Sequence, residues 1–191
     1  VTAEVTPHHL ALGTDLLVGY DPVYKVNPPL RPTEDQEAIR EALIDGTIDA
    51  VATDHAPHAR HDKEHAFPDA AFGMLGLETA LGVVVDLLVR PGLLSWADVA
   101  ERMSIAPARI AGLPSHGQPI EVGAPANLVL VDPDASWIVD RDASHSRSRN
   151  NPWHGRTLHG AVHATLLRGA CTAYRGRVAP VGEHLALEEL T

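Results

Sequence analysis

The sequence predicts an α/β fold in which a strand–helix–strand unit is followed by further helices and a β-rich tail. Three observations support this prediction. Residues 1–6 alternate apolar and β-branched residues, residues 33–46 have helical periodicity, and residues 47–54 form a mostly apolar run typical of a buried parallel strand. A strand, a proline-rich loop, a helix and a second strand in this order indicate a βαβ unit.

The helix at residues 33–46 has recognisable start and stop signals. Thr33 is the expected N-cap, Gln36 would complete a capping box, and Gly46 would end the helix. One face of this helix is apolar, which predicts that it packs against the strands; it carries Ala38, Ile39, Ala42 and Leu43.

Prolines punctuate the first segment, and the middle of the chain is expected to be helical. Residues 21–32 are too rich in proline to form a helix, and residues 58–73 are polar and irregular, like a loop. Residues 74–92 have helical length and a strong apolar face. Two shorter helices are expected at residues 95–104, with Ser95 as N-cap, and at residues 106–113.

Beyond residue 113 the chain becomes β-rich, which predicts two units, residues 1–113 and residues 114–191. Strand-like alternation covers residues 123–142 and 163–178, with turns at the Asp-Pro-Asp and Arg-Gly sequences. The polar residues 143–160 lie between these strands. Their basic run lacks interleaved aromatic residues for base stacking, so we expect it at the surface or in an interface.

Composition narrows the possible partners. Fifteen basic and twenty-five acidic side chains give a net charge of −10, which disfavours nucleic acid and favours small molecules or other proteins. The single cysteine, Cys171, excludes an internal disulfide, is expected to be buried in a strand, and fits a cytoplasmic location. No apolar stretch is long enough to span a membrane, and no secretory leader is expected.

Asp54 ends the run of the second predicted strand. His55 is the next residue, and His58 follows three residues later. Functional residues of parallel α/β folds collect at the carboxyl ends of the strands, so these side chains are expected beside one cleft. Two interpretations of Asp54 stay open at this point. It is either part of a metal site or the cap of an ordinary turn.

Other polar residues offer weaker candidates. Asn27 and Arg31 lie on a proline-stiffened segment, where an amide and a guanidinium could orient a carboxylate, unless the segment is a plain connector. The adjacent His8 and His9 are interpreted as a structural turn. His61 and His65, four residues apart, belong more simply to a solvated loop than to a metal pair.

Several segments together resemble the C-terminal half of the bacterial type of dihydroorotase, a family of the amidohydrolase superfamily. They are VTAEVTPHHL, YKVNPPLRP, IDAVATDHAPH, FGMLGLETAL and GAPANLVLVD. The resemblance covers nearly the whole chain, and allantoinases and hydantoinases resemble its NPPLR and ATDHAPH segments less closely. It implies the C-terminal part of a (β/α)₈ barrel with strands of a small β-sandwich, one or two zinc ions, and reversible cyclisation of N-carbamoyl-L-aspartate to L-dihydroorotate.

The resemblance also implies roles for individual residues. Asp54 matches the aspartate that ligates zinc at the end of the last barrel strand and acts as the catalytic acid/base. Asn27 and His58 match substrate-binding positions. Phe72 and Gly73 match a backbone segment that contacts the pyrimidine ring, whereas Arg31 matches no assigned position.

A barrel of this kind needs about 250 residues, so the chain is expected to be part of a longer enzyme that is inactive without its N-terminal half. The remaining zinc ligands would lie outside this chain. The expected partners are that missing half, the small-molecule substrate, and either further copies of the enzyme or a transcarbamoylase. The alternatives are another cyclic-amide hydrolase, such as an allantoinase or hydantoinase, and a non-catalytic subunit that scaffolds the transcarbamoylase.

Overall fold

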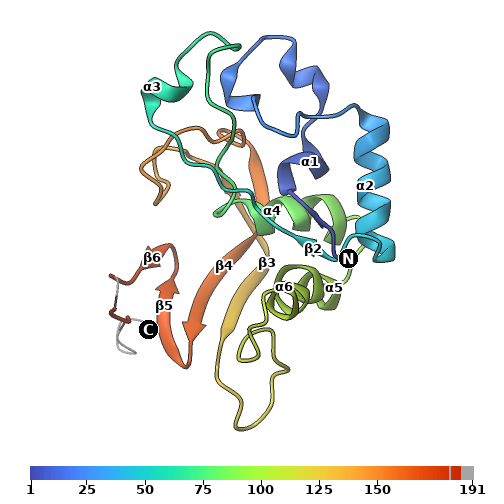
Figure 1. Cartoon of the computed structure of the whole chain (residues 1–191). Coiled ribbons are helices and arrows are strands. Elements are labelled where there is room, and N and C mark those ends of the chain that lie inside the picture. Colours follow the sequence, from blue (N-terminus) through green and yellow to red (C-terminus); the bar gives the residue numbers. More distant parts are fainter. Residues whose placement is uncertain (181, 186–191) are drawn as a thin grey trace.

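A computed structural model describes residues 1–180 and 182–185 of the chain. Its first part is the βαβ unit, with the short strands β1 (Glu4–Val5) and β2 (Ala50–Val51) paired in parallel (Figure 1). Four helical segments connect them, and they are α1 (Pro7–Ala11), η1 (Thr14–Leu17), η2 (Pro22–Tyr24) and α2 (Thr33–Asp45). The prediction of a βαβ unit is confirmed, although both strands are shorter than their sequence runs.

Helix α2 ends as predicted but begins differently. Gly46 takes a left-handed conformation, with φ of 91°, and ends the helix. Pro32, not Thr33, is the N-cap, and the expected capping box is absent. Gln36 is buried, and its side chain donates to the Arg31 carbonyl and accepts from Arg40. Of the predicted apolar face Leu43 is buried, but Ala38 is exposed, because the helix turns its Gln36 side toward the core.

The middle of the chain is helical, with two corrections to the predicted bounds. A short helix, α3 (Arg60–Lys63), lies within the expected loop. The helix expected from residue 74 begins only at α4 (Ala80–Val84) and continues as the π-helical η3 (Val85–Val89), because Met74 pairs with His55 in a parallel bridge instead.

The two short helices expected after residue 94 form one helical run in the structure. It comprises α5 (Trp96–Ala100), the π-helical η4 (Glu101–Ile105) and α6 (Ala106–Ile110). The N-cap prediction is confirmed, since Ser95 and Asp98 form a full capping box. The expected break before residue 106 is absent, because the wider π turn accommodates Pro107, which lacks an N–H, without ending the helix.

The β-rich tail forms one antiparallel sheet in the order β3-β4-β5-β6, comprising β3 (Leu128–Ile138), β4 (Thr157–Leu167), β5 (Ala170–Tyr174) and β6 (Arg177–Val178). Both Arg-Gly turns are confirmed, and all four of their residues have positive φ, as two-residue hairpin loops require. At the predicted Asp-Pro-Asp turn, Oδ1 of Asp132 accepts the backbone N–H groups of Asp134 and Ala135, but this turn is an irregularity inside β3 and does not end the strand. Strand β4 also begins earlier than expected, at Thr157.

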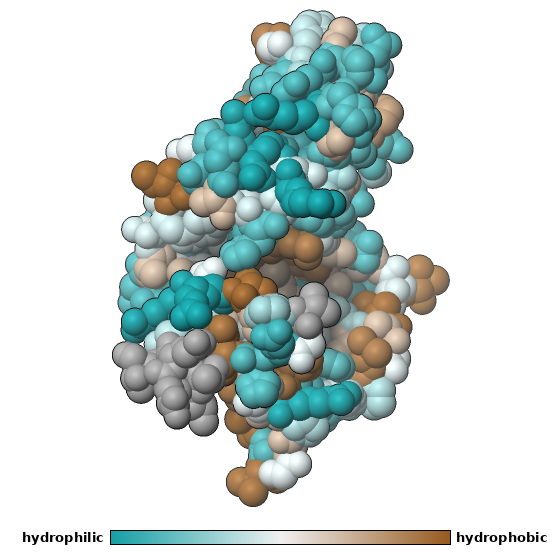
Figure 2. Space-filling model, turned by 90° about the vertical axis from the view of Figure 1, so that its left-hand side faces the viewer, coloured by the Kyte–Doolittle hydropathy of each residue, from teal (hydrophilic) through white to brown (hydrophobic). Residues whose placement is uncertain are grey.

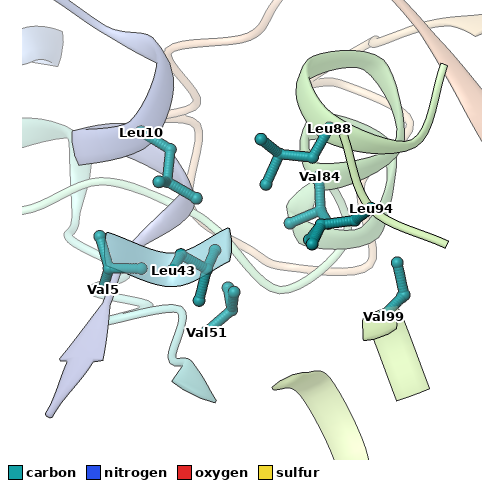
Figure 3. Packing of buried hydrophobic residues seen from close by; sticks show 8 residues of the cluster. All are labelled: Val5, Leu10, Leu43, Val51, Val84, Leu88, Leu94 and Val99. Carbon is teal, nitrogen blue, oxygen red and sulfur yellow. The ribbon is translucent and has the colours of Figure 1, made fainter. Parts of the chain in front are cut away.

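Two apolar clusters hold these parts together. In the first, side chains from β1, β2, α1 and α2 face those of α4, η3 and α5 (Figure 3); its buried members are Val5, Leu10, Leu43, Val51, Val84, Leu88, Leu94 and Val99. The second cluster includes Val26, Met74 and Val83 together with Trp153 and Leu158 of the tail. Each fully buried aliphatic side chain contributes roughly 1.5–3 kcal/mol, so the second cluster fixes the tail against the preceding segments.

Polar contacts add to this attachment. His159 of β4 lies 2.8 Å from Asp86 of η3 through its Nδ1, and its backbone N–H donates to the same carboxylate. Seen from the side, hydrophilic residues dominate the upper part of the molecule, whereas apolar residues gather lower down, at the height of the β3–β6 sheet (Figure 2). Among the described residues, no helix has the length and apolarity needed to cross a membrane.

Candidate active site

Asp54 lies just beyond the end of β2, at the edge where the chain leaves the sheet. Its φ of 45° is a left-handed conformation that few residues other than glycine, asparagine and aspartate adopt. The side chain is exposed and forms no hydrogen bond or ion pair with any residue of 1–180 or 182–185. A turn-capping aspartate accepts backbone N–H groups, so the structure does not support the cap interpretation.

His55, which follows Asp54, has a structural role in this arrangement. Its Nδ1 accepts hydrogen bonds from the backbone N–H groups of Gly76, at 3.1 Å, and Leu77, at 3.3 Å. These two donors fix the neutral tautomer with the proton on Nε2. His55 therefore anchors the segment that leads into α4, and the structure does not place it as a partner of Asp54.

His58, Phe72 and Gly73, to which the resemblance assigns substrate binding, lie together in the structure. The Nε2 of His58 donates to the Phe72 carbonyl at 2.7 Å, which leaves Nδ1 as an acceptor. Gly73 has a φ of 121°, and a Cβ built on it would lie 2.4 Å from the Cβ of Ala56 and 3.2 Å from Nε2 of His58. Only glycine fits this position, because the backbone approaches residues 56–58 too closely for a side chain.

The backbone N–H and C=O groups of Phe72 and Gly73 differ in whether they already have hydrogen-bond partners. Gly73 donates its N–H to the Lys25 carbonyl at 2.9 Å, and its own carbonyl accepts from Lys63 and Asn150. The N–H of Phe72 has no partner among the described residues. The free backbone donor next to His58 is therefore the N–H of Phe72, whereas Gly73 contributes through its shape.

Two buried lysines that sequence reasoning missed hold the segment in place. Nζ of Lys25 donates to the carbonyls of Pro68 and Ala70, each at 2.7 Å, and lies over the Phe72 ring. Nζ of Lys63 donates to the carbonyls of Ala71, Gly73 and Lys25. Burial lowers the pKa of Lys63 to about 8, and the neighbouring Lys25 charge adds to this effect. Lys63 lies in a polar run of the sequence and Lys25 in the proline-rich segment, and neither pattern indicates a buried lysine.

Asn150 is the third residue that sequence reasoning missed. The basic run around it was expected at the surface or in an interface, but within it Asn150, Asn151 and Trp153 are buried in the chain itself. The Asn150 amide donates to the carbonyls of Ala56, at 2.8 Å, and Gly73, at 3.2 Å, and its Oδ1 accepts the backbone N–H of His58. Through Asn150, the tail therefore holds the backbone of residues 56–58 against that of Gly73.

The side chain of Asn27 is exposed. The carbonyl of the next residue, Pro28, accepts a 2.9 Å hydrogen bond from Nε2 of His9, whose Nδ1 lies 2.6 Å from the Thr6 hydroxyl. Arg31 is paired with Asp35 at the start of α2, and both side chains are exposed. This pairing gives Arg31 a local role, in line with its lack of an assigned one.

Neither histidine pair forms a metal site. His8 and His9 belong to helix α1, which Thr6 caps, and not to the turn that we predicted. His8 is buried while His9 reaches Pro28, so the two rings serve different contacts. His61 is largely exposed beside Asp62, and His65 is exposed, as the solvated-loop interpretation predicted.

The described residues cannot hold a zinc ion by themselves. No group of three or more histidine, cysteine, aspartate or glutamate side chains is placed for one within residues 1–180 and 182–185. Zinc sites use three or four protein ligands. The exposed, unpartnered carboxylate of Asp54 fits one such ligand, and the others would have to come from further barrel segments.

Comparisons with known proteins define the class. The model of the amidohydrolase family matches residues 26–171, and the chain belongs to this family. It is 61% identical over 181 residues to the dihydroorotase of Mycobacterium leprae. This match covers 95% of the chain and 42% of that protein. It is 57% identical to the dihydroorotase of Mycobacterium tuberculosis, covering 93% of the chain and 41% of the relative.

Solved structures confirm the predicted fold class. The L-hydantoinase of Arthrobacter aurescens superposes with a TM-score of 0.87 at 34% identity, covering 94% of this chain and 41% of that one. The chain therefore has the fold of part of an amidohydrolase barrel with its adjoining sheet. It spans about two fifths of the length of the curated relatives that it matches.

The buried His8 of α1 predicts how the stability of the fold depends on pH. Burial lowers its pKa from 6.5 to about 3, and its Nε2 has no partner among the described residues. Between these two pH values the unfolded state binds one more proton than the native state, so stability falls as the pH falls from 6.5 toward 3. At pH 5 this loss amounts to about 2 kcal/mol.

The His8 prediction is tested in a hybrid enzyme, namely the Mycobacterium leprae dihydroorotase in which this chain replaces the segment that it matches. We expect His8→Leu to reduce the drop in thermal midpoint between pH 7 and pH 5. The matched change at the exposed His61, His61→Leu, should leave that drop unaltered. Equal drops in the hybrid enzyme and its His8→Leu variant would contradict a buried, neutral His8.

Proposed function

We propose that this chain forms the C-terminal barrel segment and adjoining sheet of a dihydroorotase, which interconverts N-carbamoyl-L-aspartate and L-dihydroorotate in pyrimidine biosynthesis. The observation that carries the proposal is the unpartnered Asp54 carboxylate at the end of β2, next in the chain to the segment that closes onto Phe72 and Gly73. The 61% identity to a dihydroorotase supports this substrate over a hydantoin, since the hydantoinase is 34% identical.

The residues on the rim suit a substrate that carries a carboxylate, ring N–H groups and ring carbonyls. The Asn27 amide offers two donors and one acceptor, and Nδ1 of His58 offers an acceptor. We propose that the Phe72 N–H, which has no partner among the described residues, donates to a ring carbonyl or carboxylate oxygen. Holding the ring in this way can account for several kcal/mol of the barrier.

The chemistry proposed for Asp54 is proton transfer. In ring opening, the oxygen of water adds to the ring carbonyl carbon, the carbon–nitrogen bond breaks, and the nitrogen gains a proton. Asp54 accepts the proton of the attacking water and delivers it to the leaving nitrogen, and the reverse sequence closes the ring. Zinc, when bound through Asp54 and ligands outside this chain, would polarise the carbonyl and lower the pKa of water.

Asn27 and His58 are expected to act in substrate binding. In the hybrid enzyme, Asn27→Ala and His58→Ala should each raise KM for dihydroorotate by about tenfold, since each removes hydrogen bonds worth roughly 1–2 kcal/mol. Steady-state kinetics give both constants. Arg31→Ala is the matched control on the same loop, and its KM should stay unchanged. Unaltered kinetics for both Asn27→Ala and His58→Ala would remove them from the site.

A growth experiment tests the function as a whole. A bacterium that lacks its own dihydroorotase needs added uracil, and the gene for the hybrid enzyme should remove that need. The same gene carrying Asp54→Asn should fail to do so at equal protein levels. Growth supported equally by both genes would remove Asp54 from the catalytic machinery. Growth supported by neither gene would contradict the proposal and favour the non-catalytic scaffold, for which an exposed Asp54 has no evident use.

Three further parts of the proposal concern organisation. We propose that residues 1–113 belong to the barrel and residues 114–191 to the composite β domain, which the absence of strands between β2 and β3 supports within the described residues. The remaining barrel segments would supply the other zinc ligands. Association with further copies or with a transcarbamoylase is proposed from the resemblance alone.

A further inference from the structure

Lys63 has an unusual environment for a lysine. Its side chain is buried, and its Nζ lies 2.9 Å from the carbonyl oxygen of Ala71, 3.0 Å from that of Gly73 and 3.4 Å from that of Lys25. An ammonium group has three N–H donors, and three carbonyls face it. No carboxylate forms an ion pair with Lys63 among the described residues. Its bonding capacity is therefore spent entirely on backbone.

The three carbonyls belong to two separate parts of the candidate site. Ala71 and Gly73 flank Phe72, whose N–H is free, while Lys25 lies two residues before Asn27. A hydrogen bond from the Gly73 N–H to the Lys25 carbonyl joins the same two parts. Lys63 thus fixes the distance between the segment that carries Asn27 and the segment that carries Phe72, which together are called the binding rim.

We propose that Lys63 is a positioning residue for substrate binding, which sets the Phe72–Gly73 backbone against the Lys25–Asn27 segment without touching the substrate. This inference rests on the proposed function. The inference goes beyond the proposed function because it assigns the geometry of the binding residues to a side chain that does not take part in the reaction. Because the contacts are to the binding rim and not to Asp54, loss of the ammonium should affect KM far more than kcat.

The test uses the hybrid enzyme with Lys63→Met, which keeps the length of the side chain but removes its donors. The control is Arg60→Met, on the same short helix, since Arg60 is exposed and its side chain is paired, within the part of the chain that the structure describes, only with Glu64. We expect Lys63→Met to raise KM for dihydroorotate at pH 7 at least tenfold with kcat within threefold of the hybrid value. The Arg60→Met variant should match the hybrid in both constants.

A second measurement does not depend on activity. Amide hydrogen exchange should become at least tenfold faster at Ala71 and Gly73 in Lys63→Met, while the amides of α2 keep their protection. Retained protection in α2 shows that the variant has folded. If the hybrid itself fails to act on dihydroorotate, the proposed function is wrong, and exchange alone then decides whether Lys63 holds this segment.

Restoring the missing group from solution makes the test specific. Lys63 lines a cavity of about 270 Å³ together with His58 and Asn150. A small amine can therefore enter Lys63→Ala. Propylammonium should lower the raised KM of that variant at least threefold, and tetramethylammonium, which has no N–H, should not. Unchanged KM or unchanged exchange in Lys63→Met would overturn the proposal, as would a loss confined to kcat.

Discussion

Replacing Asp54 with asparagine in the hybrid enzyme is expected to lower kcat for dihydroorotate by a factor of about 10³ or more, while the thermal midpoint changes little. The large effect follows because asparagine cannot accept and return the proton, and general acid–base groups contribute about 10²–10⁴-fold. The small effect on stability follows because the carboxylate is exposed and has no partner among the described residues. Steady-state kinetics and thermal unfolding of the same samples measure both.

Asp69→Asn is the matched control for this change. Asp69 is exposed in the same loop region and its side chain makes no hydrogen bond or ion pair among the described residues. Its replacement should leave kcat, KM and the thermal midpoint unaltered. Residual activity above about a tenth of the hybrid value in Asp54→Asn would exclude Asp54 as the acid/base.

Gly73→Ala is expected to damage both stability and substrate binding. The added Cβ would lie 2.4 Å from the Cβ of Ala56, and a φ of 121° is unfavourable for alanine. Overpacking costs about 1–3 kcal/mol and a backbone conformation of this kind costs about as much. The segment must shift to relieve the contact. The free N–H of Phe72 moves with it, and KM for dihydroorotate should rise at least tenfold.

Gly92→Ala separates the two causes. Gly92 also has a positive φ, of 78°, but a Cβ built there has no atom within 4 Å. This control should lower stability by about 1 kcal/mol, through backbone strain alone, and leave KM unchanged. If Gly73→Ala lowered stability no more than Gly92→Ala and kept the KM of the hybrid, the close approach of residues 56–58 to Gly73 would not matter for binding.

Local patterns predicted the local structure well. The helix end at Gly46, the N-cap at Ser95 and both Arg-Gly turns depend on a few adjacent residues, and all were confirmed. The predictions that failed also relied on adjacent residues alone. Residues 74–79 have helical character, but pairing of Met74 with His55 prevents a helix there, and this competing contact is not visible in the local sequence.

The candidate site divides in the same way. His58, Phe72 and Gly73 could be placed together through a resemblance between whole motifs. Asn150 could not, because its contact with Ala56 joins residues 94 positions apart, and its neighbours in sequence are polar and basic. Lys25 and Lys63 were missed for a related reason. A lysine satisfied by backbone carbonyls leaves no pattern in the sequence, since carbonyls are present at every residue.

The ratio of kcat/KM for dihydroorotate to kcat/KM for hydantoin and for allantoin, measured on the purified hybrid enzyme, tests the central claim most directly. In that enzyme the residues proposed to act on the substrate, Asp54, His58 and Asn27, come from this chain and contribute to the preference. We predict a ratio of at least 10³ in favour of dihydroorotate over each alternative. A ratio near one, or a preference for hydantoin or allantoin, would contradict the assignment of this site to dihydroorotate.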